Sequence, residues 1–161
     1  MGVEIERKFL VNRAIWGQAF KGEGQPYRQG YISTDPNKTI RVRLAGRKAY
    51  LTIKGISRGA SRPEFEYAIP EADAKQLLDQ FCMTAISKIR FRVEHEGRLW
   101  EVDEFSGDNL GLVMAELELQ DENEPVQLPT WIDREVTGDS RYFNSNLSIH
   151  PYTSWKEPPQ I

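Results

Sequence analysis

Apolar and polar residues alternate along most of this chain, and the alternation predicts a sheet with one apolar and one charged face. In an extended strand, successive side chains point to opposite faces, so residues two apart share a face. The pattern predicts strands over residues 4–11, 27–33, 39–44, 49–54, 64–69, 87–93, 99–103 and 112–119. Many of their apolar positions hold β-branched or aromatic residues, which are typical of strands.

Three segments are expected to be helical. Residues 71–83 predict the clearest helix, because they begin with acidic residues and then carry an apolar stripe at helical spacing. Shorter helices are expected over residues 12–21 and 131–136. The chain after residue 142 is rich in Asn, Ser and Pro, so we expect little regular structure beyond one turn, and an irregular tail from about 148 to 161.

One face of the predicted sheet collects charged residues in closely spaced pairs. They are Glu4, Glu6, Lys8, Arg41, Arg43, Lys54, Glu64, Glu66, Lys88, Arg90, Arg92, Glu101, Asp103, Glu116 and Glu118. The opposite face is apolar, and the predicted helices would cover it. Two arrangements fit this pattern: an open sheet with its charged face in water, or a closed barrel with the charges inside, which also removes the sheet edges.

The residue types on the charged face indicate binding of phosphate and metal. Arginine pairs bidentately with phosphate oxygens, and clustered carboxylates are unfavourable unless a cation neutralises them. Glu4 and Glu6, about 7 Å apart on one strand face, suit a hard divalent cation, and Lys8 adds positive charge for an anion. For this strand alone, the alternative is a half-buried strand whose polar face meets water. Taken together, the charged pairs describe a site for polyphosphate and divalent metal.

Length and composition restrict the class of protein. A chain of 161 residues fits a single domain over 1–161, and its 39% hydrophobic and 28% charged residues are ordinary for a globular protein. The net charge of −3 argues against a general nucleic-acid-binding surface. The single Cys82 excludes an internal disulfide and a cysteine-based metal cluster. No signal peptide or membrane-spanning apolar run is evident, so a cytoplasmic location without a membrane partner is expected.

The segment Glu4-Ile5-Glu6-Arg7-Lys8 resembles the ExExK signature of the CYTH, or triphosphate tunnel metalloenzyme, superfamily. Further charged segments follow in the order of that family: Arg41-Val42-Arg43, Lys54, Glu64-Phe65-Glu66, Lys88-Ile89-Arg90, Glu101-Val102-Asp103 and Glu116-Leu117-Glu118. The segment 135–139, with Tyr142 and Asn144 after it, is similar to the small bacterial members, and the resemblance spans residues 3–147. It implies an α+β fold, mainly antiparallel β, in which eight strands close into a tunnel with a charged lumen and helices packed outside.

The resemblance also implies residue roles and a cofactor, Mg²⁺ or Mn²⁺. The expected metal ligands are Glu4, Glu6, Glu116 and Glu118, with Asp103 and Glu66 as further or water-mediated ligands. The expected triphosphate-binding residues are Lys8, Arg41, Arg43, Lys54, Lys88 and Arg90. Of these, Glu4, Glu6, Lys8, Arg41 and Arg43 are expected to be catalytic. Glu64 and Glu101 stay open between metal ligand and arginine partner, and Arg92 between phosphate contact and solvated tunnel mouth.

The first function expected is hydrolysis of inorganic triphosphate, with weaker action on nucleoside triphosphates. The family resemblance also allows a class IV type adenylate cyclase or a thiamine triphosphatase. A non-catalytic module that binds polyphosphate or nucleotide is a further alternative, but phosphate binding alone needs the arginines and not the carboxylates. The sequence has no Ser/His/Asp or Cys/His nucleophile arrangement and no phosphate-binding Gly-x-x-x-x-Gly-Lys loop, so we expect direct attack by water on a terminal phosphorus.

Overall fold

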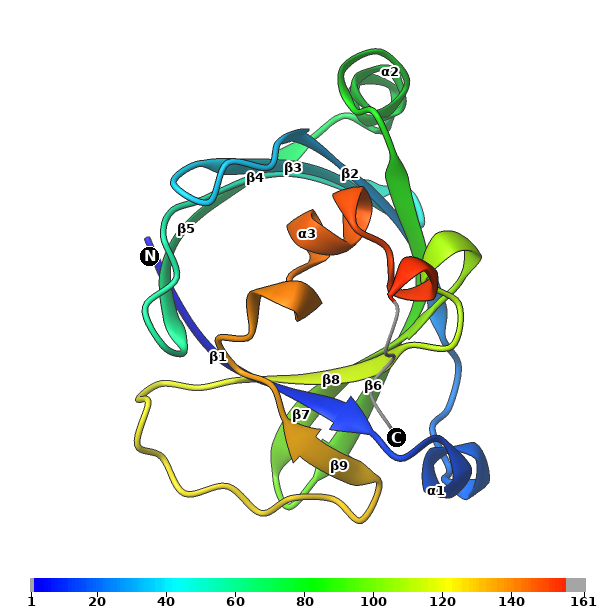
Figure 1. Cartoon of the computed structure of the whole chain (residues 1–161), viewed down its shortest axis with the longest axis vertical. Coiled ribbons are helices and arrows are strands. Elements are labelled where there is room, and N and C mark those ends of the chain that lie inside the picture. The colour runs from blue at the N-terminus through cyan, green and yellow to red at the C-terminus, as the bar shows by residue number, and fades with distance from the viewer. Residues whose placement is uncertain (1, 156–161) are drawn as a thin grey trace.

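Antiparallel strands close into a barrel in the computed structural model, which describes residues 2–155 (Figure 1). The strands are β1 (Val3–Val11), β2 (Gln25–Ser33), β3 (Thr39–Ala45), β4 (Lys48–Lys54), β5 (Ser61–Ile69), β6 (Ala85–His95), β7 (Arg98–Phe105), β8 (Val113–Glu118) and β9 (Ile132–Glu135). The α-helices are α1 (Arg13–Gln18), α2 (Glu71–Phe81) and α3 (Asn144–Ile149). Single 3-10 turns are η1 (Gly107–Asn109), η2 (Ser140–Tyr142) and η3 (Tyr152–Ser154).

Strand β1 closes the barrel. The sheet order is β5-β4-β3-β2-β6-β7-β8-β1, and the start of β1 pairs with β5 to complete the circle. The rest of β1 pairs with β8, from Glu6 opposite Glu118 to Leu10 opposite Met114. Closure gives each of these eight strands a partner on both edges, which removes the exposed edges of an open sheet. The closed eight-stranded tunnel is therefore confirmed, and the open sheet is excluded.

The helix predicted over 131–136 is wrong, because these residues form the ninth strand. Strand β9 pairs with the end of β1, where Phe9 lies opposite Glu135 and Val11 opposite Ile132. The backbone at both ends of β9 is also fixed to β1 and its extension, since Val136 N donates to Lys8 O and Asn12 N donates to Trp131 O, each at 2.8 Å. A segment this short has no decisive hydrophobic period, so the free edge of β1 decides its conformation.

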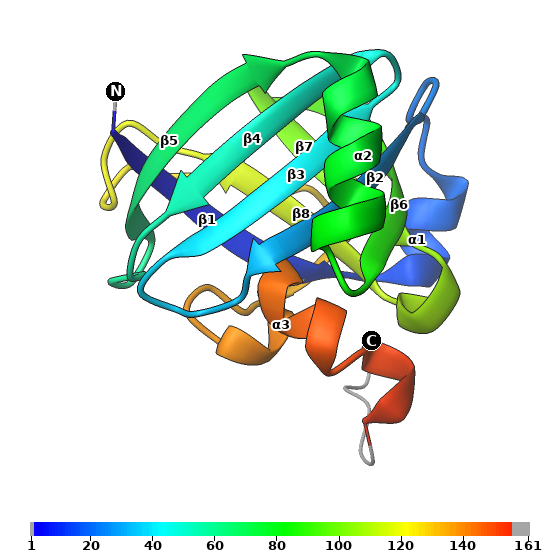
Figure 2. The same cartoon turned by 90° about the horizontal axis from the view of Figure 1, so that it is seen from above.

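The chain after residue 142 is more regular than predicted. Helix α3 and the turns η2 and η3 lie across one end of the barrel (Figures 1 and 2). Tyr142 and Leu147 are fully buried there against the barrel end. This burial explains the helix, because packing stabilises a single helical turn that its sequence would not stabilise alone. The part of the expected irregular tail over 156–161 lies outside the described residues.

Three apolar clusters pack outside the tunnel. One joins α1 and Trp131 to the outer faces of β1, β6, β7 and β8 around Trp100, and a second lies under the closed end of the barrel. The third lies beneath α2, whose Ala74 and Leu78 pack on β3 and β4. The outer face of β5 is not covered in the same way, because Phe65 and Tyr67 stay half exposed. None of the helices in the described part of the chain is long and apolar enough to span a membrane.

Local sequence accounts for the ends of the two outer helices. Helix α1 begins after Asn12, whose side-chain oxygen accepts a hydrogen bond from Ile15 N. Helix α2 begins directly after Pro70 and carries Glu71 and Asp73 in its first turn, where acidic residues favour the helix dipole. Both predicted outer helices are confirmed, although each ends earlier than the sequence indicated.

Candidate functional site

The lumen of the barrel holds a cavity of about 630 Å³ that all eight barrel strands line. Its basic lining residues are Lys8, Arg41, Arg43, Arg47, Lys48, Lys54, Arg62, Lys88, Arg90 and Arg92. Its acidic lining residues are Glu4, Glu6, Glu64, Glu66, Glu101, Glu116 and Glu118. Every residue predicted for the site is among them except Asp103. The excess of basic groups around one enclosed volume favours an anionic ligand.

Strands β1 and β8 form an acidic wall, which consists of Glu4, Glu6, Glu116 and Glu118. The antiparallel register places Glu6 opposite Glu118, and Lys8 opposite Glu116. Burial raises the pKa of Glu6 well above its usual range, and the carboxylates of Glu116 and Glu4 raise it further. The pKa values of Glu4 and Glu118 are also raised, mainly by burial. Burial and the mutual repulsion of these carboxylates therefore disfavour the ionised forms of Glu4, Glu6 and Glu118.

Glu116 differs from the other members of the acidic wall. Burial would raise its pKa, but the charges of Lys8 and Arg90 outweigh burial and hold the pKa of Glu116 well below its usual range. Its carboxylate lies 3.7 Å from Lys8 Nζ and accepts a hydrogen bond of 3.0 Å from Arg90 Nη2. Glu116 thus stays ionised and links the acidic wall to the cations beside it.

The acidic wall has the donor chemistry of a site for a divalent cation. No three acidic, histidine or cysteine side chains within residues 2–155 already converge as closely as a metal ion requires. The oxygen donors nevertheless suit a hard cation such as Mg²⁺ or Mn²⁺. A bound cation would also favour the ionised carboxylates of Glu4, Glu6 and Glu118, whose pKa values are raised mainly by burial. These residues therefore fit a metal, provided that their side chains turn toward it.

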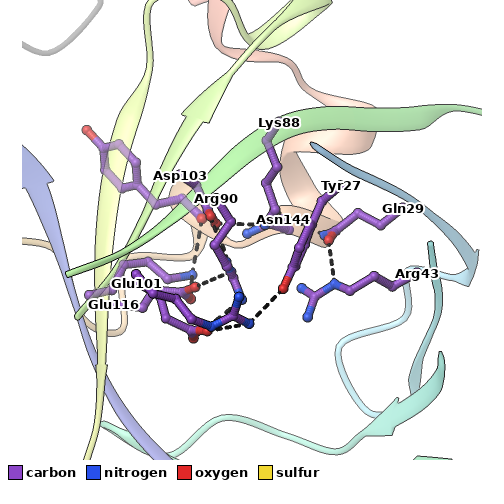
Figure 3. Close-up of polar contacts among 12 residues, drawn as sticks. Tyr27, Gln29, Arg43, Lys88, Arg90, Glu101, Asp103, Glu116 and Asn144 are labelled. Atoms are coloured by element: carbon purple, nitrogen blue, oxygen red, sulfur yellow. Dashed lines mark hydrogen bonds and ion pairs between the residues drawn. The ribbon is translucent and has the colours of Figure 1, made fainter. Parts of the chain in front are cut away.

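A buried ion-pair network adjoins the acidic wall (Figure 3). Arg90 donates two hydrogen bonds to Asp103, of 2.7 and 2.8 Å, and Lys88 Nζ lies 2.8 Å from the same carboxylate. Burial would raise the pKa of Asp103, but Arg90 and then Lys88 lower it to about 2. Asp103 is only 2% exposed and does not line the cavity. This position does not favour the metal role expected for Asp103, because both of its oxygens already pair with cations.

Lys88 is the most deeply buried cation of the site, at 2% exposure. Burial lowers its pKa to about 7, and the nearby charge of Asp103 only partly offsets this effect. Lys88 Nζ also donates a hydrogen bond of 3.1 Å to Asn144 Oδ1. The ammonium group is therefore held between a carboxylate and an amide at the edge of the cavity.

Strands β3 and β4 carry the opposing basic wall, which consists of Arg41, Arg43 and Lys54. Arg41 Nη2 donates to Thr52 Oγ1 at 3.1 Å and lies 3.3 Å from Glu66, while Lys54 Nζ lies 3.1 Å from Glu4. The buried Arg41 Nε has no hydrogen-bond partner among the described residues. A buried donor without an acceptor is unfavourable, so this atom is suited to a ligand oxygen.

Tyr27 joins three arginines near the open mouth of the tunnel. The guanidinium carbons of Arg43 and Arg90 lie 5.1 and 4.9 Å from the centre of its ring. Its hydroxyl oxygen accepts a hydrogen bond of 2.9 Å from Arg92, which also lies 3.4 Å from Glu101. Arg92 thus lies at the cavity edge with 46% of its side chain exposed, so the choice between a phosphate contact and a solvated tunnel mouth stays open, whereas Glu101 is observed as an arginine partner.

The opposite end of the tunnel is covered by residues 139–149, which we call the closing segment. Its Tyr142 carbonyl oxygen accepts a hydrogen bond of 3.3 Å from Lys8 Nζ. The ring of Phe143 lies 5.4 Å from Lys8 Nζ and 5.7 Å from the guanidinium carbon of Arg62. The closing segment thus contacts cations of the lumen as well as covering its end.

Sequence analysis missed several residues of this cavity. They include Tyr27, Arg47, Lys48, Arg62 and Asn144. Tyr27 lies opposite Lys88 and lines the cavity, but it is uncharged, so the pattern of charged pairs does not single it out. Arg47 lies in the turn between β3 and β4, and Lys48 is the first residue of β4. Arg62 lies in a segment whose glycine and serine residues resemble those of a loop. Asn144 was singled out only as part of a family resemblance, without a role.

Comparisons with known proteins agree with this architecture. The family model of the CYTH domain matches residues 2–149. An inorganic triphosphatase of Acetivibrio thermocellus is 52% identical over 160 residues, which is 98% of this chain and 100% of that protein. An inorganic triphosphatase of Nitrosomonas europaea is 33% identical over 150 residues, which is 91% of this chain and 97% of that protein. A crystal structure of an inorganic triphosphatase has a TM-score of 0.63 at 31% identity, covering 91% of this chain and 97% of that chain.

The matched region contains everything that builds the tunnel. Residues 2–149 include the eight barrel strands, strand β9 and helix α3, and with them both charged walls. The agreement therefore extends over the complete cavity and not over a single motif. The chain belongs to the CYTH domain family.

Proposed function

We propose that the protein hydrolyses inorganic triphosphate with the aid of a divalent cation. The observation that carries this proposal is one enclosed cavity in which a basic wall on β3 and β4 faces an acidic wall on β1 and β8. The relative from Acetivibrio thermocellus, 52% identical over nearly the whole chain, is an inorganic triphosphatase and supports the same substrate.

The cations of the lumen are suited to grip a chain of phosphates. Arg41 and Arg43 lie two residues apart on β3, so both guanidinium groups point into the lumen and can reach one phosphate chain. The unpartnered Arg41 Nε adds a donor that a phosphate oxygen would satisfy. Lys8 and Arg90 approach from the other side of the lumen, where their positive charge would stabilise charge that develops on the leaving group.

The acidic wall is proposed to hold the divalent cation, Mg²⁺ or Mn²⁺, through Glu4, Glu6, Glu116 and Glu118. When bound, such a cation neutralises phosphate charge and polarises the phosphoryl group that is attacked. The carboxylates of this wall would also orient a water molecule for in-line attack on a terminal phosphorus. The bond between that phosphorus and its bridging oxygen breaks, and the products are phosphate and diphosphate.

Asp103 is proposed to act indirectly. It fixes the guanidinium of Arg90 by a bidentate pair and shares Lys88, so it orients two cations that face the substrate. Glu64 and Glu66 are proposed to do the same for the basic wall, since they lie 3.3 Å from Lys54 and 3.3 Å from Arg41, respectively.

A panel of substrates tests the proposal. Purified protein is incubated with inorganic triphosphate, ATP or thiamine triphosphate, each with Mg²⁺, Mn²⁺ or EDTA. Metal-dependent release of phosphate from inorganic triphosphate, at a higher kcat/KM than from either other substrate, is the expected result. Formation of cyclic AMP would instead indicate a cyclase, and binding without turnover would indicate a non-catalytic module. The absence of nucleic-acid and membrane partners and the cytoplasmic location stay predictions.

A further inference from the structure

The amide of Asn144, in the closing segment, connects to cations on two strands, Lys88 on β6 and, through Gln29 on β2, Arg43 on β3 (Figure 3). Its Oδ1 accepts hydrogen bonds from Lys88 Nζ and from Gln29 Nε2, each at 3.1 Å. The other end of the Gln29 amide, Oε1, accepts a hydrogen bond of 3.0 Å from Arg43 Nε. Gln29 is completely buried, so water cannot replace either contact. The three hydrogen bonds form one chain from Asn144 to Arg43, with Lys88 as a branch.

Chemistry fixes the direction of every hydrogen bond in this chain. Arginine and lysine can only donate. Arg43 Nε therefore requires the carbonyl end of Gln29, which turns the Gln29 NH₂ group toward Asn144. Asn144 must then present its oxygen, and Lys88 requires the same oxygen. The arrangement has a single consistent orientation of both amides.

A neutral acceptor has an advantage at this position. Arg43 has its pKa lowered to about 10 by burial and by the nearby charges of Arg41 and Arg90, so the basic wall is already electrostatically strained. A carboxylate would relieve that repulsion but would also cancel positive charge that a phosphate needs. An amide oxygen orients Arg43 and Lys88 and leaves their charge available to the ligand.

We propose that Asn144 is a positioning residue for triphosphate, which sets the orientation of Lys88 directly and of Arg43 through Gln29. The inference rests on the proposed function, because it assigns these two cations to the phosphate chain. Without the Asn144 oxygen, Lys88 keeps only Asp103, at 2.8 Å, and turns toward a carboxylate that does not line the cavity. The Gln29 NH₂ group then keeps only the longer hydrogen bond to the Tyr31 hydroxyl, at 3.3 Å, among the described residues. The amide is held less firmly, so the orientation of Arg43 is loosened.

The closing segment offers a matched control. Asn146 lies two residues further along, and its amide donates to Ser140 O within the same segment without contacting the lumen. Asn144→Leu and Asn146→Leu thus make the same chemical change, and each removes an amide that forms hydrogen bonds. Only the first removes an acceptor from cations of the cavity.

The test compares Asn144→Leu, Gln29→Leu, the double variant and Asn146→Leu with wild type by kcat, KM and melting temperature. We expect Asn144→Leu to lower kcat/KM for triphosphate by about ten- to hundredfold, with Asn146→Leu within about twofold of wild type. Gln29→Leu should add little to Asn144→Leu, because the two residues act in series. Asn144→Asp, which keeps the acceptor oxygen, should recover much of kcat while raising KM.

Two kinetic results would overturn the inference. One is an equal kcat/KM for folded Asn144→Leu and Asn146→Leu, and the other is fully multiplicative losses in the double variant. Calorimetric titration of inorganic triphosphate into metal-free protein separates this inference from the proposed function. If wild type binds triphosphate but does not hydrolyse it, the proposed function fails. The role of Asn144 is still supported in that case if Asn144→Leu binds triphosphate at least tenfold more weakly than Asn146→Leu does. Equal affinities in these two variants would refute it.

Discussion

Replacement of Asp103 by Asn should destabilise the fold measurably, although the two side chains are nearly the same size. Asp103 is 2% exposed and compensates the charges of Arg90 and Lys88. Removing one partner of a buried ion pair typically costs about 3–5 kcal/mol, because a buried charge is left uncompensated. Arg90 keeps Glu116 and Glu101 at 3.0 and 3.3 Å, so its charge is not left alone. We therefore expect the lower end of the range, about 3 kcal/mol.

Lys88 also limits the loss. Its pKa is already lowered to about 7 by burial, and Asp103 is the first of the charges that oppose this shift. Without that carboxylate the pKa of Lys88 should fall further, so the lysine becomes neutral at pH 7 instead of remaining a buried charge. The expected destabilisation thus comes from the lost hydrogen bonds and one lost ion pair, and not from an uncompensated charge on Lys88.

The dependence on pH gives a second readout of the same residue. The pKa of Asp103 is lowered to about 2 in the folded protein, against about 3.9 for an unperturbed aspartate. A lowered pKa contributes stability that is complete above the unfolded pKa and is lost as the pH falls through the folded pKa. This contribution is on the order of 2–3 kcal/mol, and it disappears between about pH 4 and pH 2. Asp103→Asn should lack this part of the acid transition.

Urea unfolding at pH 7 and between pH 5 and pH 2 measures both effects. Asp133→Asn is the control, because Asp133 is exposed on β9 and has no ion pair among the described residues. It should unfold within about 0.5 kcal/mol of wild type, as surface substitutions usually do. A stability of Asp103→Asn equal to that of this control would show that the network does not hold Arg90 and Lys88 as described.

Three further predictions concern the cavity itself. Arg41→Lys keeps the charge but loses the planar fork and the free Nε, so kcat/KM for triphosphate should fall by about ten- to hundredfold in steady-state kinetics. The affinity for metal without substrate, measured by calorimetry, should stay unchanged. Tyr27→Phe removes only the hydrogen bond from Arg92, whereas Tyr27→Leu also removes two cation–π contacts of about 0.5–1 kcal/mol each. The kcat/KM for triphosphate should therefore be clearly lower in the leucine variant, and equal values in the two variants would refute a role for the ring. Triphosphate with Mg²⁺ at about a hundred times its Kd should raise the melting temperature by about 5–10 °C in a thermal scan, and an unchanged value would contradict a preformed cavity.

Alternation predicted the charged lumen because a strand has a period of two wherever it lies. Glu4, Glu6 and Lys8 share a face in any extended β1, and the same geometry places Arg41 beside Arg43. Closure of the barrel followed only from the family resemblance, because the alternating pattern is the same for an open sheet. In the structure it depends on one pairing between residues far apart in sequence, β1 with β5.

The misassigned segments depended on contacts that the local sequence does not contain. Residues 132–135 form a strand because the end of β1 offers an unpaired edge, and α3 forms because Leu147 is buried beneath the barrel. The role of Asn144 depends on where α3 lies, so it could not be predicted before the closing segment was placed. Asp103 shows the same limit, since alternation gives its face of the sheet but not the position of the nearest cation.

The most direct test of the central claim is release of phosphate from inorganic triphosphate by wild type, Glu6→Gln and Glu23→Gln, each titrated with Mg²⁺ or Mn²⁺. Glu6 belongs to the acidic wall, whereas Glu23 is exposed between α1 and β2. We predict metal-dependent formation of phosphate and diphosphate by wild type and Glu23→Gln, and a loss of at least a hundredfold in Glu6→Gln with the folded structure retained. Turnover by Glu6→Gln at the wild-type rate and with the same metal dependence would contradict the assignment of the acidic wall. Absence of turnover by wild type with either metal would contradict the proposed function.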